Sequence, residues 1–174
     1  MSSSYTVGYI IGSLSTESIN RTLSKALIRL APENLTLVEI PIRDLPVYNR
    51  DFDADYPPAG RALKDAIASV DAVLFVTPEY NRGIPGSLKN AIDWASRPYG
   101  TNSLTRKPSA VIGASPGKKR CVGVALGGQP SRGRTVRTRV MKTPNASMKS
   151  RRNCSVALSV TSPSSVISPG VNWM

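Results

Sequence analysis

Hydrophobic positions along the chain alternate between short apolar runs and segments with helical spacing. Four runs contain β-branched residues and are typical of buried strands; they cover 5–12, 35–42, 71–77 and 108–115. Three intervening segments place apolar side chains every three or four positions, as amphipathic helices do; they cover 18–31, 59–70 and 86–97. Because strands and helices alternate, the pattern predicts an α/β fold with a parallel sheet covered by helices on both faces.

The three loops that follow strands of this sheet hold the candidate chemistry. In open parallel sheets, ligands bind at the carboxyl ends of the strands. The loops after residues 11, 77 and 114 are all rich in Gly, Ser, Pro or Asn. We therefore expect a functional site where these three loops meet.

The first loop, "GSLSTESIN" at 12–20, carries several hydroxyl groups immediately before a predicted helix. A helix N-terminus presents unpaired N–H groups and a partial positive charge, which suits a phosphate. The spacing matches neither G-x-G-x-x-G nor G-x-x-x-x-G-K-[ST], so neither the dinucleotide fingerprint nor the NTPase loop is present. The alternative is a polar turn in which Ser18 is only a helix cap. Taken alone, the loop supports both interpretations equally.

The second loop lies in "TPEYNRGIPGSLKNAIDW" at 77–94. Its prolines stiffen the turn, and its glycines allow another group to approach the backbone closely. Tyr80 offers an aromatic face and Asn81 offers a donor and an acceptor, so this loop could bind the edge of a flat heterocycle. The alternatives are that Glu79 is a solvated carboxylate and that Tyr80 is a half-buried packing residue.

Composition narrows the chemistry further. The chain has 174 residues, which suits one domain, and it contains no histidine. Enzymes that use a Ser-His pair, a Cys-His pair or the usual zinc ligands therefore lose their commonest base or ligand. Cys121 and Cys154 show no metal-ligand spacing and are interpreted as incidental residues of a reducing compartment. No signal peptide or membrane-spanning run is predicted, which makes a cytoplasmic location the expectation.

Four segments carry a resemblance to a known family: "GSLSTESIN", "DLPVYNRD", "VLFVTPEYNRGIPGSLKNAIDWASRP" and "KPSAVIGASPG". In this order, over residues 5–117, they resemble the NADPH-dependent FMN reductases, and especially their bacterial chromate/quinone reductase branch. The resemblance implies a flavodoxin-like three-layer α/β sandwich with a parallel sheet. It also implies FMN as cofactor, with NADPH or NADH as electron donor.

The resemblance assigns site residues by position. The FMN phosphate would be held by Ser13, Ser15, Ser18, the backbone of Ile19, and Asn20. The isoalloxazine ring would be held by Pro78, Glu79, Tyr80 and Asn81. The loop closing over the flavin would contribute Ser115, Pro116 and Gly117. Close relatives often carry an arginine where this chain has Ser15, and Arg21 or the helix terminus could partly compensate for that missing cation. No catalytic acid, catalytic base or metal ligand is assigned.

The function that the resemblance implies is FMN-dependent NAD(P)H:acceptor oxidoreduction. Quinones, and more broadly chromate or azo compounds, would be reduced in a ping-pong cycle through the flavin. The partners would be small-molecule electron acceptors and further copies of the chain, in a homodimer or homotetramer. Tyr48 and Asn49 would approach the flavin of the neighbouring subunit. Neither a membrane nor a nucleic acid is expected as a partner.

Residues 118–174 depart from this pattern. Residues 1–93 carry 9 Lys+Arg and 11 Asp+Glu, whereas 94–174 carry 14 Lys+Arg and no acid. The resemblance therefore predicts an FMN-binding region at 1–117 and a basic, atypical tail at 118–174. "VALSV" is the one plausible strand of the tail.

Three interpretations of the tail remain: a basic arm for nucleic acid or lipid, a diverged C-terminal half, or the product of a frameshift near Lys118. The abrupt change and the absence of acids favour the frameshift. In that case the last strand and helix of the fold would be missing or altered, and a strand edge would be open. The alternative function is then a flavin-binding or basic interaction protein without turnover.

Overall fold

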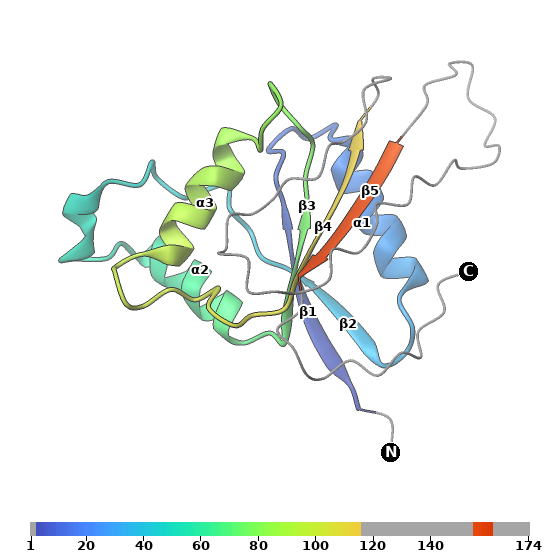
Figure 1. Ribbon diagram of the computed structural model, residues 1–174, viewed down its shortest axis with the longest axis horizontal. Coiled ribbons are helices and arrows are strands. Elements are labelled where there is room, and N and C mark those ends of the chain that lie inside the picture. Colours follow the sequence, from blue (N-terminus) through green and yellow to red (C-terminus); the bar gives the residue numbers. More distant parts are fainter. Residues whose placement is uncertain (1–2, 116–154, 162–174) are drawn as a thin grey trace.

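The computed structural model describes residues 3–115 and 155–161, whose strands form a single five-stranded sheet (Figure 1). The strands are β1 (Tyr5–Ile11), β2 (Leu35–Glu39), β3 (Ala72–Val76), β4 (Ser109–Ser115) and β5 (Ser155–Thr161). Their order across the sheet is β2-β1-β3-β4-β5, and β1 to β4 all run parallel. This order is that of flavodoxin-like folds, so the predicted sheet is confirmed.

The helices cover both faces of the sheet. They are α1 (Ile19–Leu30), α2 (Pro58–Ala68) and α3 (Gly86–Ser96), with the short 3₁₀ helix η1 (Arg50–Asp53) before α2. Figure 1 shows α1 on one side of the sheet and both α2 and α3 on the other, which confirms the predicted three layers. Within the described ranges, no helix is long and apolar enough to cross a bilayer.

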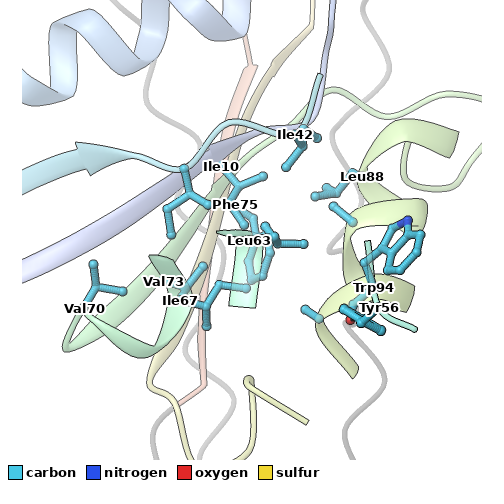
Figure 2. Packing of buried hydrophobic residues seen from close by; sticks show 13 residues of the cluster. Ile10, Ile42, Tyr56, Leu63, Ile67, Val70, Val73, Phe75, Leu88 and Trp94 are labelled. Atoms are coloured by element: carbon cyan, nitrogen blue, oxygen red, sulfur yellow. The ribbon is translucent and has the colours of Figure 1, made fainter. Parts of the chain in front are cut away.

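The larger core lies between the sheet and the α2–α3 face (Figure 2). Side chains of successive strand residues point to opposite faces, so Val73 and Phe75 of β3 both point to this side. They pack in one cluster with Leu63 and Ile67 of α2 and with Trp94 of α3. Trp94 is fully buried and its indole N–H donates to the carbonyl of Pro46 at 2.7 Å. This core fixes α3 and therefore the loop that precedes it.

The smaller core lies under α1. Tyr9 and Ile11 of β1, with Val76 and Ile112 from the neighbouring strands, form a second buried cluster. The half-buried side chains of Leu23 and Leu27, four residues apart on α1, cover it. Burial of this helical stripe holds α1 parallel to the sheet, with its amino end at the carboxyl edge of β1.

The last strand differs in direction from the other four. β5 pairs antiparallel with β4, from Ser115 opposite Ser155 to Ser109 opposite Thr161. It contains the "VALSV" segment, and its direction confirms the expectation that the C-terminal strand is altered. The edge of β4 that would be open without a last strand is covered by β5 along all seven residues, so β5 is the outermost described strand on this side.

Candidate functional site

Three loops meet at the carboxyl edge of the parallel sheet, as expected from the topology. The backbone N–H of Gly12, just after β1, donates to the carbonyl of Val76 in β3 at 2.9 Å. Thr77, just after β3, donates its N–H to the carbonyl of Ile112 in β4 at 2.9 Å. These bonds hold the three strand ends at one level.

Gly12 sits where the first two loops touch. A Cβ at this position would lie 2.2 Å from Oγ1 of Thr77 and 2.7 Å from its Cβ, far inside contact distance. The carbonyl of Gly12 also accepts a hydrogen bond from the hydroxyl of Ser87 in α3 at 2.9 Å. Sequence reasoning missed Thr77 and Ser87. The sequence feature that could have identified Thr77 is a hydroxyl directly after a predicted buried strand. No sequence feature distinguishes Ser87.

Asn20 connects the first loop to the third strand of the site. Its amide oxygen accepts from the N–H of Ala114 at 2.8 Å, and its amide nitrogen donates to the carbonyl of Ala114 at 3.1 Å. The side chain is buried, with 1% exposure. Asn20 therefore fastens the amino end of α1 to the end of β4, and this contact accounts for its burial.

The hydroxyls of Ser13 and Ser18 remain without a partner in the described part of the chain. The two residues are only 5% and 7% exposed, and Ser18 is the cap residue of α1 without making a side-chain capping bond. No fully buried polar side-chain atom among residues 3–115 lacks a partner, so these two hydroxyl oxygens reach the surface. Ser15 and Ile19 are exposed beside them. The loop thus presents hydroxyls next to the free N–H groups of a helix N-terminus, the arrangement that suits a phosphate.

The second loop ends in a tight two-residue turn. Tyr80 and Gly83 exchange two backbone hydrogen bonds of 2.9 Å, while Asn81 and Arg82 take positive φ angles of 52° and 63°. Both central residues in the left-handed region are typical of a type I′ turn. Tyr80 is 53% exposed, so about half of its surface is open to solvent beside the turn.

The other two ring-binding candidates lie close to the sheet. Pro78 is buried directly after β3 and Glu79 is half-buried. The loop therefore places backbone and side-chain groups beside the exposed ring of Tyr80, at the same edge as the hydroxyls of the first loop.

Two arginines lie near the first loop, and their environments differ. Arg21 forms an ion pair with Glu39 at 3.2 Å, and the same carboxylate accepts from the hydroxyl of Tyr9 at 3.2 Å. Burial, followed by the charge of Glu39, raises the pKa of Tyr9 above its ordinary value. Arg43, which sequence reasoning missed, donates to the carbonyl of Leu14 in the first loop at 2.5 Å.

Tyr48 and Asn49 are held by contacts away from the three loops. The hydroxyl of Tyr48 donates to Asp53 at 2.9 Å, and its ring meets Trp94 edge-on, with 5.2 Å between centroids. The side chain of Asn49 caps η1 by accepting from the N–H of Asp51 at 3.3 Å. Their approach to a neighbouring flavin remains a prediction.

The third loop is described only at its start. Ser115 ends β4, and nothing is described of its side chain, while Pro116 and Gly117 lie outside the described residues. In the ranges that are described, no group of three His, Cys, Asp or Glu residues could hold a metal ion. The groups that the described residues present at this edge include hydroxyls, backbone N–H groups and the guanidinium of Arg43.

The sequence of this chain matches that of one known protein family over most of its length. The family described as NADPH-dependent FMN reductase matches residues 5–149. The chain belongs to this family. The match begins with β1 and extends beyond residue 117, where the segments quoted above end. Membership in the NADPH-dependent FMN reductases confirms the resemblance drawn from the four quoted segments.

Individual relatives agree with this assignment. The chain is 52% identical over 118 residues to a quinone reductase of Pseudomonas putida, covering 67% of this chain and 63% of the relative. It is 45% identical over 127 residues to a 2-hydroxy-1,4-benzoquinone reductase of a Burkholderia species, covering 73% and 68%. The first of these matches shows that the chain spans less than two thirds of that relative's length.

Among solved structures, the chain is similar to FerB, a flavoenzyme NAD(P)H:acceptor oxidoreductase from Paracoccus denitrificans. The two share 54% identity with a TM-score of 0.63, covering 66% of this chain and 63% of FerB. The likeness supports the flavodoxin-like α/β assignment.

Proposed function

We propose that this protein is an FMN-dependent NAD(P)H:acceptor oxidoreductase that reduces quinones. One observation carries the proposal: the unpartnered hydroxyls of Ser13 and Ser18 at the amino end of α1, on the edge where three parallel strands end. Its relatives support the choice of acceptor, because two of them are named as quinone or benzoquinone reductases.

The residues on this edge fit an FMN phosphate. Ser13, Ser15 and Ser18 supply hydroxyl donors, and the backbone N–H of Ile19 supplies a donor at the positive end of α1. Asn20 holds this loop against β4 through its two bonds to Ala114. Its contribution to phosphate binding is therefore mainly to position the other donors.

The second loop fits the flat ring of a flavin. Pro78 and Glu79 follow β3, and the tight turn holds Tyr80 and Asn81 beside them. A rigid turn exposes backbone N–H and C=O groups that could bind a heterocycle edge, and the Tyr80 ring offers an apolar face. Ser115, Pro116 and Gly117 complete the proposed set, as the family resemblance implies.

The cofactor and the protein would have different roles in this reaction. When bound, FMN supplies hydride and electron transfer between a reduced nicotinamide and an acceptor. The protein's own residues bind and orient the cofactor, and backbone donors near the ring favour a negative charge on it. The absence of histidine from the sequence is compatible with this role, since no side-chain base is assigned.

The finer parts of the proposal concern mechanism and assembly. Donor and acceptor would use the same face of the site in turn, which gives ping-pong kinetics, and chromate and azo compounds would be secondary acceptors. The working unit would be a homodimer or homotetramer in the cytoplasm.

The test uses the full chain reconstituted with FMN. We expect about one FMN per chain in the purified protein, and NADPH or NADH oxidation that depends on an added quinone. Double-reciprocal plots at several quinone concentrations should give parallel lines. Intersecting lines would contradict the ping-pong proposal, and the absence of bound FMN would contradict the proposed function.

The second candidate is a flavin-binding protein without turnover. The reversed direction of β5 favours it, because the strand next to the third loop departs from the all-parallel arrangement. Stoichiometric FMN binding without quinone-dependent oxidation of NADPH or NADH would support this candidate over the enzyme.

A further inference from the structure

The first loop contains no positively charged side chain that could bind a phosphate monoester. Residues 12–18 contain no Lys or Arg, and they contain one carboxylate, Glu17. Hydroxyls and a helix N-terminus supply dipoles, and a cation beside them would add a stronger, charge-assisted bond to the phosphate. Such a positive charge would have to come from another element.

Arg21 is poorly placed to supply this charge. It lies in the first turn of α1, but its guanidinium contacts both carboxylate oxygens of Glu39, at 3.2 and 3.3 Å. An ion-paired guanidinium has much of its charge offset and some of its donors already used. The idea that Arg21 compensates for the missing cation of the loop is therefore not supported.

Arg43 has the required position and a free charge. The segment before it is fixed, because Ile40 and Ile42 are 2% and 6% exposed and the N–H of Ile40 donates to Tyr9 at 2.9 Å. This anchoring directs Arg43 to the first loop, where its guanidinium donates to the carbonyl of Leu14 at 2.5 Å. Among residues 3–115, it forms no ion pair with any carboxylate, including its neighbour Asp44.

We propose that Arg43 is the cation that binds the phosphate monoester of FMN. This inference rests on the proposed function and extends its site to the segment after β2. Guanidinium has five N–H donors in a planar fork. One of them fastens the side chain to the carbonyl that precedes Ser15, and the remaining donors are available to phosphate oxygens.

The experiment compares two ligands that differ only in the phosphate. Dissociation constants for FMN and riboflavin would be measured by quenching of flavin fluorescence, for the wild type and for Arg43→Gln. Glutamine keeps a donor for the carbonyl of Leu14 but removes the charge. We expect FMN affinity to fall about tenfold or more, while riboflavin affinity changes by less than about twofold, since a charge-assisted bond is worth about one tenfold step or more.

The matched control is Arg29→Gln, which removes the same charge from an exposed position in the last turn of α1. It should leave both affinities unchanged. Arg43→Lys keeps the charge without the planar fork and should lie between the wild type and Arg43→Gln.

The outcomes separate this inference from the function on which it rests. Equal losses for FMN and riboflavin in Arg43→Gln would overturn it, because they would indicate a disturbed loop. Unchanged FMN affinity would also overturn it. If the wild type itself binds neither ligand, the proposed flavin function fails first.

Discussion

At the scale of single residues, several positions matter through the space and bonds they provide. Gly12 is the clearest case, since its missing side chain allows the loop after β1 to touch the loop after β3. Thr77 fills the space that a side chain there would need. The geometry of the candidate site therefore depends on a residue with no functional group.

Replacing Gly12 by alanine tests this packing. A Cβ only 2.2 Å from the hydroxyl of Thr77 forces the loops apart, so we expect a loss of about 1–3 kcal/mol in the free energy of unfolding. Gly86→Ala is the matched control, because a Cβ there meets nothing within 4 Å. Urea unfolding of both variants measures the difference. Equal stabilities would contradict the close approach.

The raised pKa of the Tyr56 hydroxyl predicts that the stability of the protein depends on pH in the alkaline range. Burial, followed by the charges of Tyr48 and Asp53, raises its pKa from 10.0 to about 12. Its hydroxyl donates to the carbonyls of Trp94 and Arg97. The unfolded chain loses this proton near pH 10 while the folded chain keeps it, so the stabilisation is complete below pH 10 and decreases towards pH 12.

The measurement compares wild type with Tyr56→Phe by urea unfolding at pH 8, 10 and 11. The difference in their free energies of unfolding should be constant up to about pH 9 and smaller at pH 11. A difference that is the same at pH 8 and pH 11 would show that the hydroxyl titrates normally in the folded protein.

Asn20 illustrates what could be predicted for single residues. Its position in a polar loop at the start of a predicted helix made it a candidate residue, and the structure joins it to the end of β4. Its partner Ala114 is 94 residues away in the sequence, and no local pattern reports such a pairing. The same is true of Arg43, which lies 29 residues from its partner Leu14 in the sequence. It belongs to none of the quoted segments and directly precedes one of them, "DLPVYNRD".

At the scale of elements, the periodicity of the sequence was sufficient for four strands and three helices. The predicted helix at 18–31 is observed as α1, and the apolar run at 108–115 is observed as β4. The predicted strand at 35–42 ends earlier, at Glu39, just before the segment that contains Pro41. Proline lacks the N–H needed to continue a ladder, which explains the shorter strand.

The connection between α1 and β4 can be tested by Asn20→Ala. This change leaves the N–H and the carbonyl of Ala114 without their buried partners, so we expect a loss of about 2–4 kcal/mol in the free energy of unfolding. Asn34→Ala removes an exposed amide that makes a single long contact with Ser3, and it should cost little.

Chemical unfolding of the two asparagine variants provides the measurement. If Asn20→Ala lowers the free energy of unfolding no more than Asn34→Ala does, the hydrogen bonds between Asn20 and Ala114 contribute little to stability. Flavin affinity should fall in Asn20→Ala as well, because the first loop would lose its connection to β4.

The direction of the last strand could not be predicted from its sequence. The alternation in "VALSV" is typical of a strand, but a two-residue period reads the same for both orientations. Only the pairing with β4 determines that β5 runs antiparallel. This is the element in which the chain differs from an all-parallel sheet.

At the scale of the whole molecule, the antiparallel register predicts a specific cross-link. Val111 faces Ser159 in the sheet, and opposite residues lie close enough for a disulfide. Val111→Cys with Ser159→Cys, in a chain whose Cys121 and Cys154 are serine, should therefore form a disulfide under mild oxidation.

The control for the cross-link places the second cysteine at position 155. Ser155 pairs with Ser115, four residues further along β4, which separates it from Val111 by about 13 Å. Non-reducing electrophoresis and mass spectrometry would measure both pairs. Preferential cross-linking of the control pair would contradict the observed register.

The charge of the molecule shows the limit of composition as a guide to function. The formal net charge is +12, although residues 1–93, which hold the first two loops of the candidate site, are slightly acidic. The net charge therefore gives little information about the candidate site, whereas the position of the Arg43 guanidinium identifies a specific cation beside the first loop.

Which of the three interpretations of residues 118–174 holds remains a prediction. Translating the other reading frames downstream of codon 117 would test it.

The pairing of β4 with β5 also bears on the order in which the chain folds. Because Ser115 and Ser155 meet at the same end of the sheet, forming this pair closes a long loop and costs chain entropy that shorter connections avoid. The same cost applies to β1 and β3, which pair over 65 residues (Val7 with Ala72), against 40 to 52 residues for β4 with β5 and 36 residues for β3 with β4. We therefore expect the pairing of β1 with β3, which brings the first two loops of the candidate site together, to be the costliest of the three to close.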